Sequence, residues 1–194
     1  QSHFYTQSPL GFQAERLKKR YRHFIDRGYQ FVHPRKDDWS RVSLEVFYLL
    51  KKLYADFPVF QSITDTQFSE IFAAYKQVLD FSLVTLAYYE SKLVGFFIPL
   101  PDYGTIVYQK LTPLNIFKIL TRRKKAKRYI LLYLGVDADH LGLGSALSYI
   151  VFKNINNRKA LSIGALIHQG KVTNHYVKEL QTAHTDYGLF IIKL

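Results

Sequence analysis

The sequence predicts an α/β protein in which a mixed sheet carries helices on both faces. Two kinds of apolar pattern alternate along the 194 residues: repeats at helical spacing, and short runs of β-branched and aromatic residues. Two such runs, 82–89 and 93–100, are separated by only three residues, which is typical of a hairpin. A third run, 129–136, leads through a glycine-containing turn into a helix-competent segment, 143–156. Helices and strands in comparable number indicate a layered α/β architecture.

The N-terminal region is predicted to contain one helix and one strand. Residues 1–8 are polar, and we expect no regular element in them. Apolar residues at helical spacing predict an amphipathic helix over 9–27, which Gly28 would end. Residues 29–33 have the composition of a short strand, and Pro34 would end it.

Two helices are expected next, and each has a signal at its start. Asp37 and Asp38 place negative charge before an apolar face that runs from Val42 to Phe57. The segment 64–67, Thr-Asp-Thr-Gln, matches a capping box, with Thr at the cap and Gln three residues later. An apolar repeat at helical spacing over 68–79 follows this box.

The C-terminal half is predicted to alternate strands with helices. Thr112 and Pro113 indicate a cap followed by a proline at the first position of a helix over 113–121. After the strand 129–136 and the helix 143–156, the pattern predicts a strand over 161–167, a helix over 172–180 and a strand over 187–193.

The composition limits the classes of function. The chain has 27 Lys and Arg against 15 Asp and Glu, a formal charge of +12 that favours an anionic partner: nucleic acid, an anionic membrane or a phosphate-bearing small molecule. The absence of Cys excludes disulfides, thiolate nucleophiles and Cys-ligated zinc. No apolar run approaches the roughly 20 residues of a membrane helix, so we expect no membrane span. No signal peptide is visible, and we expect a cytoplasmic protein.

The central motif is the unit around Gly142 and Gly144. A strand ends at Gly135-Val136, a polar connection follows over 137–140, and Leu-Gly-Leu-Gly-Ser over 141–145 opens the next helix. Unpaired amides at a helix start, next to glycines, can hold a phosphate group. A dinucleotide fingerprint would need Gly or Ala at the position of Leu147, and no phosphate-loop Gly-Lys-Ser/Thr follows. The alternative is an ordinary strand-to-helix turn without a ligand.

The order of these elements resembles the GCN5-related N-acetyltransferase (GNAT) superfamily. A hairpin at 82–100 precedes the glycine unit, and a strand, a helix and a further strand follow it. The family motif has the form Arg/Gln-x-x-Gly-x-Gly/Ala, which the Gly142-x-Gly144 pair matches in its second half. The resemblance covers residues 29–194, leaving residues 1–28 as an N-terminal helical extension. It implies a mostly antiparallel sheet. Because some members carry two such domains in tandem, it also allows residues 29–194 to be the C-terminal part of a longer chain.

The resemblance implies acetyl-coenzyme A as cosubstrate and an amine as acceptor, with no metal. Carried over to this chain, the strand that pairs with the pantetheine arm contributes Leu134, Gly135 and Val136. The loop that holds the pyrophosphate contributes the residues from the connection into the helix: His140, Leu141, Gly142, Leu143, Gly144 and Ser145. Asn174 matches a conserved position of a later helix in the family.

Two positions depart from the family pattern. Asp139 stands where the motif has Arg or Gln, and Gln181 stands seven residues after Asn174, where the family has a Tyr general acid. No general base stands out, and the catalytic residues remain unassigned. The titratable residues that the expected topology brings near the site are read as structural: Asp102, Tyr133, His140, His168, His175 and Tyr176.

The remaining motif is the basic run 122–128, six cations in seven residues. We interpret it as a solvated helix end, with capture of RNA, an anionic membrane or an acidic acceptor as the alternative.

The sequence as a whole predicts transfer of an acetyl group from acetyl-coenzyme A to a small-molecule or peptide amine, with nucleic acid not expected as a partner. Two alternatives stay open. One is a catalytically degenerate GNAT fold that serves as a coenzyme A-binding or interaction module. The other is a basic domain that binds nucleic acid or a membrane.

Overall fold

A computed structural model describes residues 2–7, 14–54, 64–108, 112–167 and 181–186. Its core is a seven-stranded sheet in the order β2-β3-β4-β5-β6-β1-β7. The strands are β1 (Ser2–Gln7), β2 (Gln30–Val32), β3 (Thr85–Tyr89), β4 (Lys92–Pro101), β5 (Arg128–Val136), β6 (Leu161–Ile167) and β7 (Gln181–Asp186). In the described ladders β5 and β6 pair in parallel, and every other neighbouring pair is antiparallel. The predicted mixed, mostly antiparallel sheet is confirmed.

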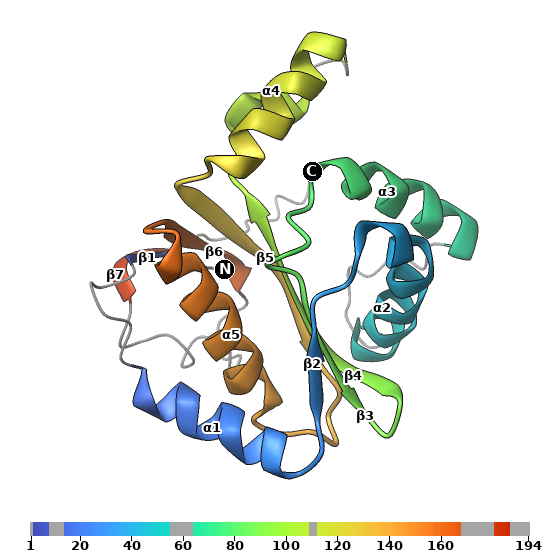
Figure 1. Cartoon of the computed structure of the whole chain (residues 1–194), viewed down its shortest axis with the longest axis vertical. Coiled ribbons are helices and arrows are strands. Elements are labelled where there is room, and N and C mark those ends of the chain that lie inside the picture. Colours follow the sequence, from blue (N-terminus) through green and yellow to red (C-terminus); the bar gives the residue numbers. More distant parts are fainter. Residues whose placement is uncertain (1, 8–13, 55–63, 109–111, 168–180, 187–194) are drawn as a thin grey trace, which may run out of the picture.

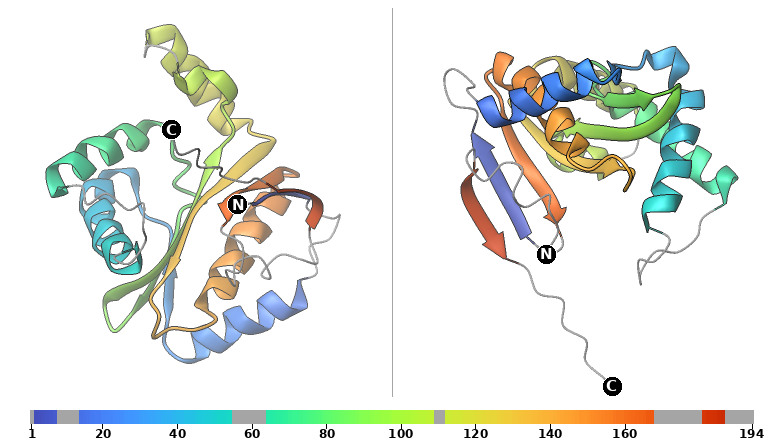
Figure 2. Two further views of the ribbon diagram at one scale, coloured as in Figure 1. Left: turned by 180° about the vertical axis from the view of Figure 1, so that it is seen from behind. Right: turned by 90° about the horizontal axis from the view of Figure 1, so that it is seen from below.

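Helices cover both faces of the sheet, as predicted (Figure 1). On one face, α1 (Glu15–Asp26) packs on α5 (Leu143–Asn157), and Phe24, Leu147 and Val151 share a core with β3, β4 and β5. On the other face, α2 (Trp39–Tyr54) and α3 (Asp65–Val78) enclose a second core. Figure 2 shows β1, β6 and β7 together at the edge of the sheet remote from α2 and α3. The remaining α-helix, α4 (Pro113–Lys124), projects beyond one end of the sheet (Figure 1).

The local signals in the sequence correspond to observed caps and turns. Thr64 and Gln67 form the predicted capping box at the start of α3. The Thr112 side chain accepts from the Asn115 amide at the start of α4. The β3–β4 hairpin closes through Glu90 and Ser91, both with positive φ, as a two-residue turn of the I′ kind requires.

The N-terminal segment differs from the prediction. Residues 2–7 form β1, which lies between β6 and β7 and pairs with both in antiparallel register. The expectation of no regular element over 1–8 is therefore wrong, because β1 is formed by pairing with residues more than 150 positions away and not by a local apolar pattern. The strand β7 was also not predicted. The helix predicted over 172–180 and the strand predicted over 187–193 lie outside the described residues.

Two glycines let the helical layers approach the sheet. Gly95 in β4 faces α5, and a Cβ there would lie 3.0 Å from Leu143 and 3.2 Å from Leu147. Gly135 in β5 faces the other layer, and its cross-strand partner Phe96 lies over it. The first contact seats the N-terminal end of α5 directly on the sheet, beside the end of β5. This junction contains the candidate site.

Candidate functional site

The first feature of the site is the separation of β5 from β6. The parallel ladder joins Arg128 to Leu161 and continues to the pair Leu131 and Gly164. Beyond that pair, β5 runs on to Val136 and β6 to Ile167, and the ladder between described residues does not continue. The edge of β5 over 132–136 therefore presents backbone donors and acceptors toward the gap between the strands. An extended ligand arm could pair with this edge as an added strand would.

The turn after β5 is tied to both neighbouring layers. The Asp137 amide donates to the Val94 carbonyl of β4 at 2.9 Å. The Lys52 ammonium of α2 donates to both carboxylate oxygens of Asp137, at 2.9 and 2.7 Å. The hydrogen bond from Lys52 lowers the pKa of Asp137 below its usual value. Asp137 is therefore an anchor of the turn, and its charge is already compensated.

His140 is held on the other side of the turn by aromatic residues. Its Nδ1 lies 2.6 Å from the Tyr29 hydroxyl, with which it shares a hydrogen bond. The Tyr29 ring stacks on Tyr89 with centroids 4.4 Å apart, and it meets the His140 ring edge to face. Burial raises the pKa of Tyr29, so its hydroxyl stays protonated at neutral pH. These contacts give His140 a positioning role in the turn.

The turn ends in an exposed set of amides at the start of α5. Gly142 has φ +89°, a left-handed conformation that glycine adopts without strain. The Leu143 amide donates to the His140 carbonyl and the Ser145 amide to the Gly142 carbonyl, both at 3.1 Å. The amides of Leu141, Gly142 and Gly144 have no acceptor within the described residues. Together with the helix dipole, such amides favour an anion at this position.

An arginine of α1 adds a positive charge beside this turn. The guanidinium carbon of Arg20 lies 3.7 Å from the position that a Cβ on Gly142 would occupy. Arg20 is exposed, and no hydrogen bond or ion pair engages it in the described part of the chain. Arg20 could not be singled out from the sequence, because it is one of many cations on an amphipathic helix. Only the packing of α1 on α5 brings it to the glycine turn.

The structure gathers most of the predicted site residues in one place. Leu134 and Val136 are half-buried and pack against the core between the sheet and α5, while Gly135 faces the opposite layer. Leu143 is fully buried, so its side chain belongs to the core. Leu141 is 86% exposed beside the free amides. Asn174 lies outside the described residues.

The predicted acid–base candidates are engaged elsewhere or not described. Asp102 pairs with Arg128 at 2.6 Å and accepts from the Gly104 amide. Tyr133 packs against the α2–α3 core. Gln181 begins β7, so this position does not carry a helical general acid. His168, His175 and Tyr176 lie outside the described residues. In the part of the chain that the structure describes, no three His, Asp or Glu side chains gather as metal ligands would.

The basic run 122–128 is divided between structural and exposed cations. Arg122 donates to the Tyr103 carbonyl at 2.7 Å, and Arg128 forms the pair with Asp102. Lys125 and Lys127 are exposed. Among the described helices, none is long and apolar enough to cross a membrane.

Comparison with known proteins places the fold. No protein-family model matches the chain, and no curated protein does. Solved structures do match. An aminoglycoside acetyltransferase from an uncultured soil metagenomic sample, in complex with sisomicin, superposes with a TM-score of 0.55 at 12% identity, over 88% of this chain and 99% of that one. A ribosomal-protein-alanine N-acetyltransferase from Brucella melitensis gives 0.53 at 13% identity, over 86% and 97%.

A third match names the superfamily in its description. It is the GCN5-related glucosamine N-acetyltransferase region of a fungal multi-domain β-N-acetylglucosaminidase, with a TM-score of 0.55 at 8% identity, over 96% of this chain and 19% of that one. The chain therefore has the fold of the GNAT superfamily. At these identities the likeness concerns the fold alone.

Proposed function

We propose that this chain is an acyl-coenzyme A-dependent N-acyltransferase that moves an acetyl group from acetyl-coenzyme A to a small-molecule or peptide amine. The observation that carries the proposal is the continuity of two features. The gap between β5 and β6 runs along the edge 132–136 to the free amides at the start of α5. A ligand with an extended amide-bearing arm and a pyrophosphate would match both features at once.

The pyrophosphate would lie at the glycine turn. The amides of Leu141, Gly142 and Gly144 can donate to its oxygens, and the absence of a side chain at Gly142 allows close approach. Arg20 can add a charge-assisted contact from the side of α1. This cation takes the role that Asp139, in the place of the family's Arg or Gln, cannot fill. Residues 1–28, the extension outside the resemblance, would then contribute to the site of residues 29–194.

The pantetheine arm would pair with the edge of β5 beyond the end of its ladder with β6. Leu134 and Val136 present one face of the strand to the core below α5, and Gly135 leaves the backbone between them uncovered by a side chain of its own. Bound acetyl-coenzyme A would supply the acetyl thioester. The amine nitrogen would form the new amide bond as the thioester C–S bond breaks, the amine would lose a proton, and the departing coenzyme A sulfur would take one up. Ordered water can carry both protons, since the carboxylates of Asp102 and Asp137 are paired with Arg128 and Lys52.

A second candidate function follows from the same residues. Asp139 is exposed at the turn, His140 is bound to Tyr29, and Asp102 is bound to Arg128. Because His140 and Asp102 are already bound to other side chains, they favour a module that binds coenzyme A without transferring its acyl group. The two functions share the binding site and differ only in turnover.

Release of the coenzyme A thiol distinguishes them. The full chain is incubated with acetyl-coenzyme A and a panel of amines that includes an aminoglycoside, a polyamine and a peptide with a free N-terminus. An acyltransferase releases thiol in proportion to enzyme and only when an amine is present. Binding of acetyl-coenzyme A without amine-dependent release by any member of the panel would favour the binding module.

A further inference from the structure

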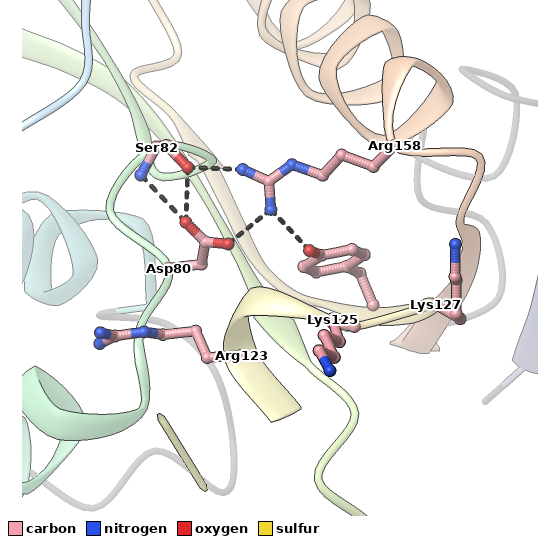
Figure 3. Close-up of a pocket in the computed structure, with 8 residues that line it drawn as sticks. Asp80, Ser82, Arg123, Lys125, Lys127 and Arg158 are labelled. Carbon is pink, nitrogen blue, oxygen red and sulfur yellow. Dashed lines mark hydrogen bonds and ion pairs between the residues drawn. The ribbon is translucent and has the colours of Figure 1, made fainter. Parts of the chain in front are cut away.

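A second cationic site lies at the other end of α5. A cavity of about 710 Å³ opens between the end of α4, the start of β5 and the C-terminal end of α5. Its charged and polar lining comprises Asp80, Ser82, Arg123, Lys125, Lys127 and Arg158 (Figure 3). The cavity lies a full helix length from the glycine turn, since the 15 residues of α5 span about 22 Å. It is therefore separate from the proposed coenzyme A site.

The inner wall of the cavity is a satisfied polar network. Arg158 Nη1 donates to Asp80 Oδ2 at 2.5 Å and to the Tyr129 hydroxyl at 2.6 Å, and its Nη2 donates to Ser82 Oγ at 2.6 Å. The Ser82 hydroxyl and amide both donate to Asp80 Oδ1. The carboxylate of Asp80 is thus neutralised by Arg158. Arg158 uses three of its five N–H donors on partners among the described residues, which leaves two for a ligand.

The outer wall adds three further positive charges. Arg123 contacts the Leu79 carbonyl at 3.5 Å, a weak hydrogen bond that does not compensate its charge. Lys125 and Lys127 are exposed and have no acidic partner within the described residues. Figure 3 shows Arg123 and Lys127 on opposite sides of the Asp80–Arg158 pair. Because the charges of Asp80 and Arg158 cancel, the lining has a net positive charge that no acidic group among the described residues balances.

The chemistry of the lining indicates the ligand. Tyr129 is 1% exposed and its hydroxyl is bound to Arg158, so the described lining of the cavity offers no open aromatic face for stacking a base. Recognition would rest on charge-assisted hydrogen bonds from Arg and Lys, which match phosphate oxygens. A volume of about 710 Å³ falls in the range of small-molecule pockets. We propose that this cavity binds the phosphate groups of a small ligand, held between the two lysines and the Arg158 guanidinium.

The test uses the full chain and a double variant, Lys125→Gln with Lys127→Gln. The control is Lys92→Gln with Lys153→Gln, which also removes two positive charges from lysines outside the cavity and outside the coenzyme A site. Inorganic pyrophosphate is titrated into isotope-labelled protein while the backbone amide resonances are followed by NMR. Within the described residues, none of the four lysine side chains makes a hydrogen bond or an ion pair, and the substitutions leave the backbone hydrogen bonds in place, so both variants should fold.

The expected result is a saturable shift of the amides of Ser82, Ala126 and Tyr129 in the wild type and in the control. In the Lys125/Lys127 variant the affinity at these amides should fall about tenfold or more. Vesicles with phosphatidylglycerol, compared with phosphatidylcholine alone, test whether the phosphate belongs to a lipid headgroup. Binding of either probe that depends on the two lysines supports the proposal and identifies the source.

The proposal is overturned if neither probe distinguishes the variant from the control, or if pyrophosphate shifts only the amides of the glycine turn. Binding of RNA alone, lost in the variant while both phosphate probes fail, would also overturn it in favour of a nucleic-acid surface. None of these outcomes depends on acetyl-coenzyme A. The proposed acyltransferase function can therefore fail or stand independently.

Discussion

Replacement of Gly135 by alanine tests whether the two sides of β5 are packed as described. A Cβ at this position would lie 2.5 and 2.6 Å from two ring carbons of Phe96 and 2.8 Å from a methyl carbon of Leu53. Phe96 is fully buried in the α2–α3 core, so its ring would have to move by about 1 Å within close-packed surroundings. Overpacking of this kind costs about 1–3 kcal/mol.

Part of that cost is offset, because alanine loses less backbone entropy on folding than glycine, an effect of about 0.5–1 kcal/mol. The net destabilisation should be about 1–2 kcal/mol, which for a chain of this size lowers Tm by about 2–8 °C. Urea denaturation and thermal unfolding measure both quantities. The matched control is Gly95→Ala, where the nearest atoms are leucine methyls at 3.0 and 3.2 Å that can yield by a few tenths of an ångström.

We expect Gly95→Ala to change the stability by less than half as much as Gly135→Ala. Unfolding of Gly135→Ala at the wild-type temperature or above it would show that β5 is not packed this closely against Phe96 and Leu53. A larger loss of stability for Gly95→Ala than for Gly135→Ala would contradict the same packing.

Three further predictions concern single side chains. Arg20→Gln should weaken binding of acetyl-coenzyme A about tenfold, as measured by calorimetry, through loss of one charge-assisted contact, while Arg22→Gln on the same helix should not. Lys52 lowers the pKa of Asp137 through a hydrogen bond, so this pair adds stability above the usual Asp pKa and loses it as the pH falls through the folded-state value. Lys52→Gln should therefore be less stable than wild type at pH 7 in urea denaturation, and the difference should vanish in acid; a difference independent of pH would contradict this. Burial, together with the hydrogen bond to Glu45, raises the pKa of Tyr88 to about 12. The contribution of Tyr88 to the stability of the fold is therefore complete below about pH 10 and is lost as the pH rises to about 12. Tyr88→Phe should reduce the loss of stability over that interval, and an unchanged alkaline slope would count against the assignment.

The sequence predicted the parts of the fold that local chemistry determines. The capping box at Thr64, the Thr112-Pro113 helix start and the β3–β4 hairpin all depend on residues within a few positions of one another. The turn from β5 to α5 was predicted for the same reason, since its glycines and its polar connection are contiguous. The alternation of helical and strand patterns along the sequence also predicted helices on both faces of the sheet.

Features made by distant residues could not be predicted in this way. The polar segment 2–7 becomes β1 only because β6 and β7 offer it two edges. Arg20 reaches Gly142 only because α1 packs on α5, and the cationic cavity exists only because Arg158 meets Asp80 across 78 positions. The sequence of the basic run 122–128 does not predict which of its cations bind backbone carbonyls and which are exposed. Such pairings are set by tertiary contacts that periodicity does not report.

Binding of acetyl-coenzyme A to the full chain, measured by isothermal titration calorimetry, tests the central claim most directly. We expect a saturable exothermic isotherm with one molecule bound per chain. Binding should be lost or strongly weakened when the pyrophosphate-bearing part of the ligand is removed and only acetyl-pantetheine remains. Equal affinity for acetyl-pantetheine would contradict the role given to the glycine turn and Arg20. Absence of binding at millimolar acetyl-coenzyme A would contradict the acyltransferase proposal as a whole.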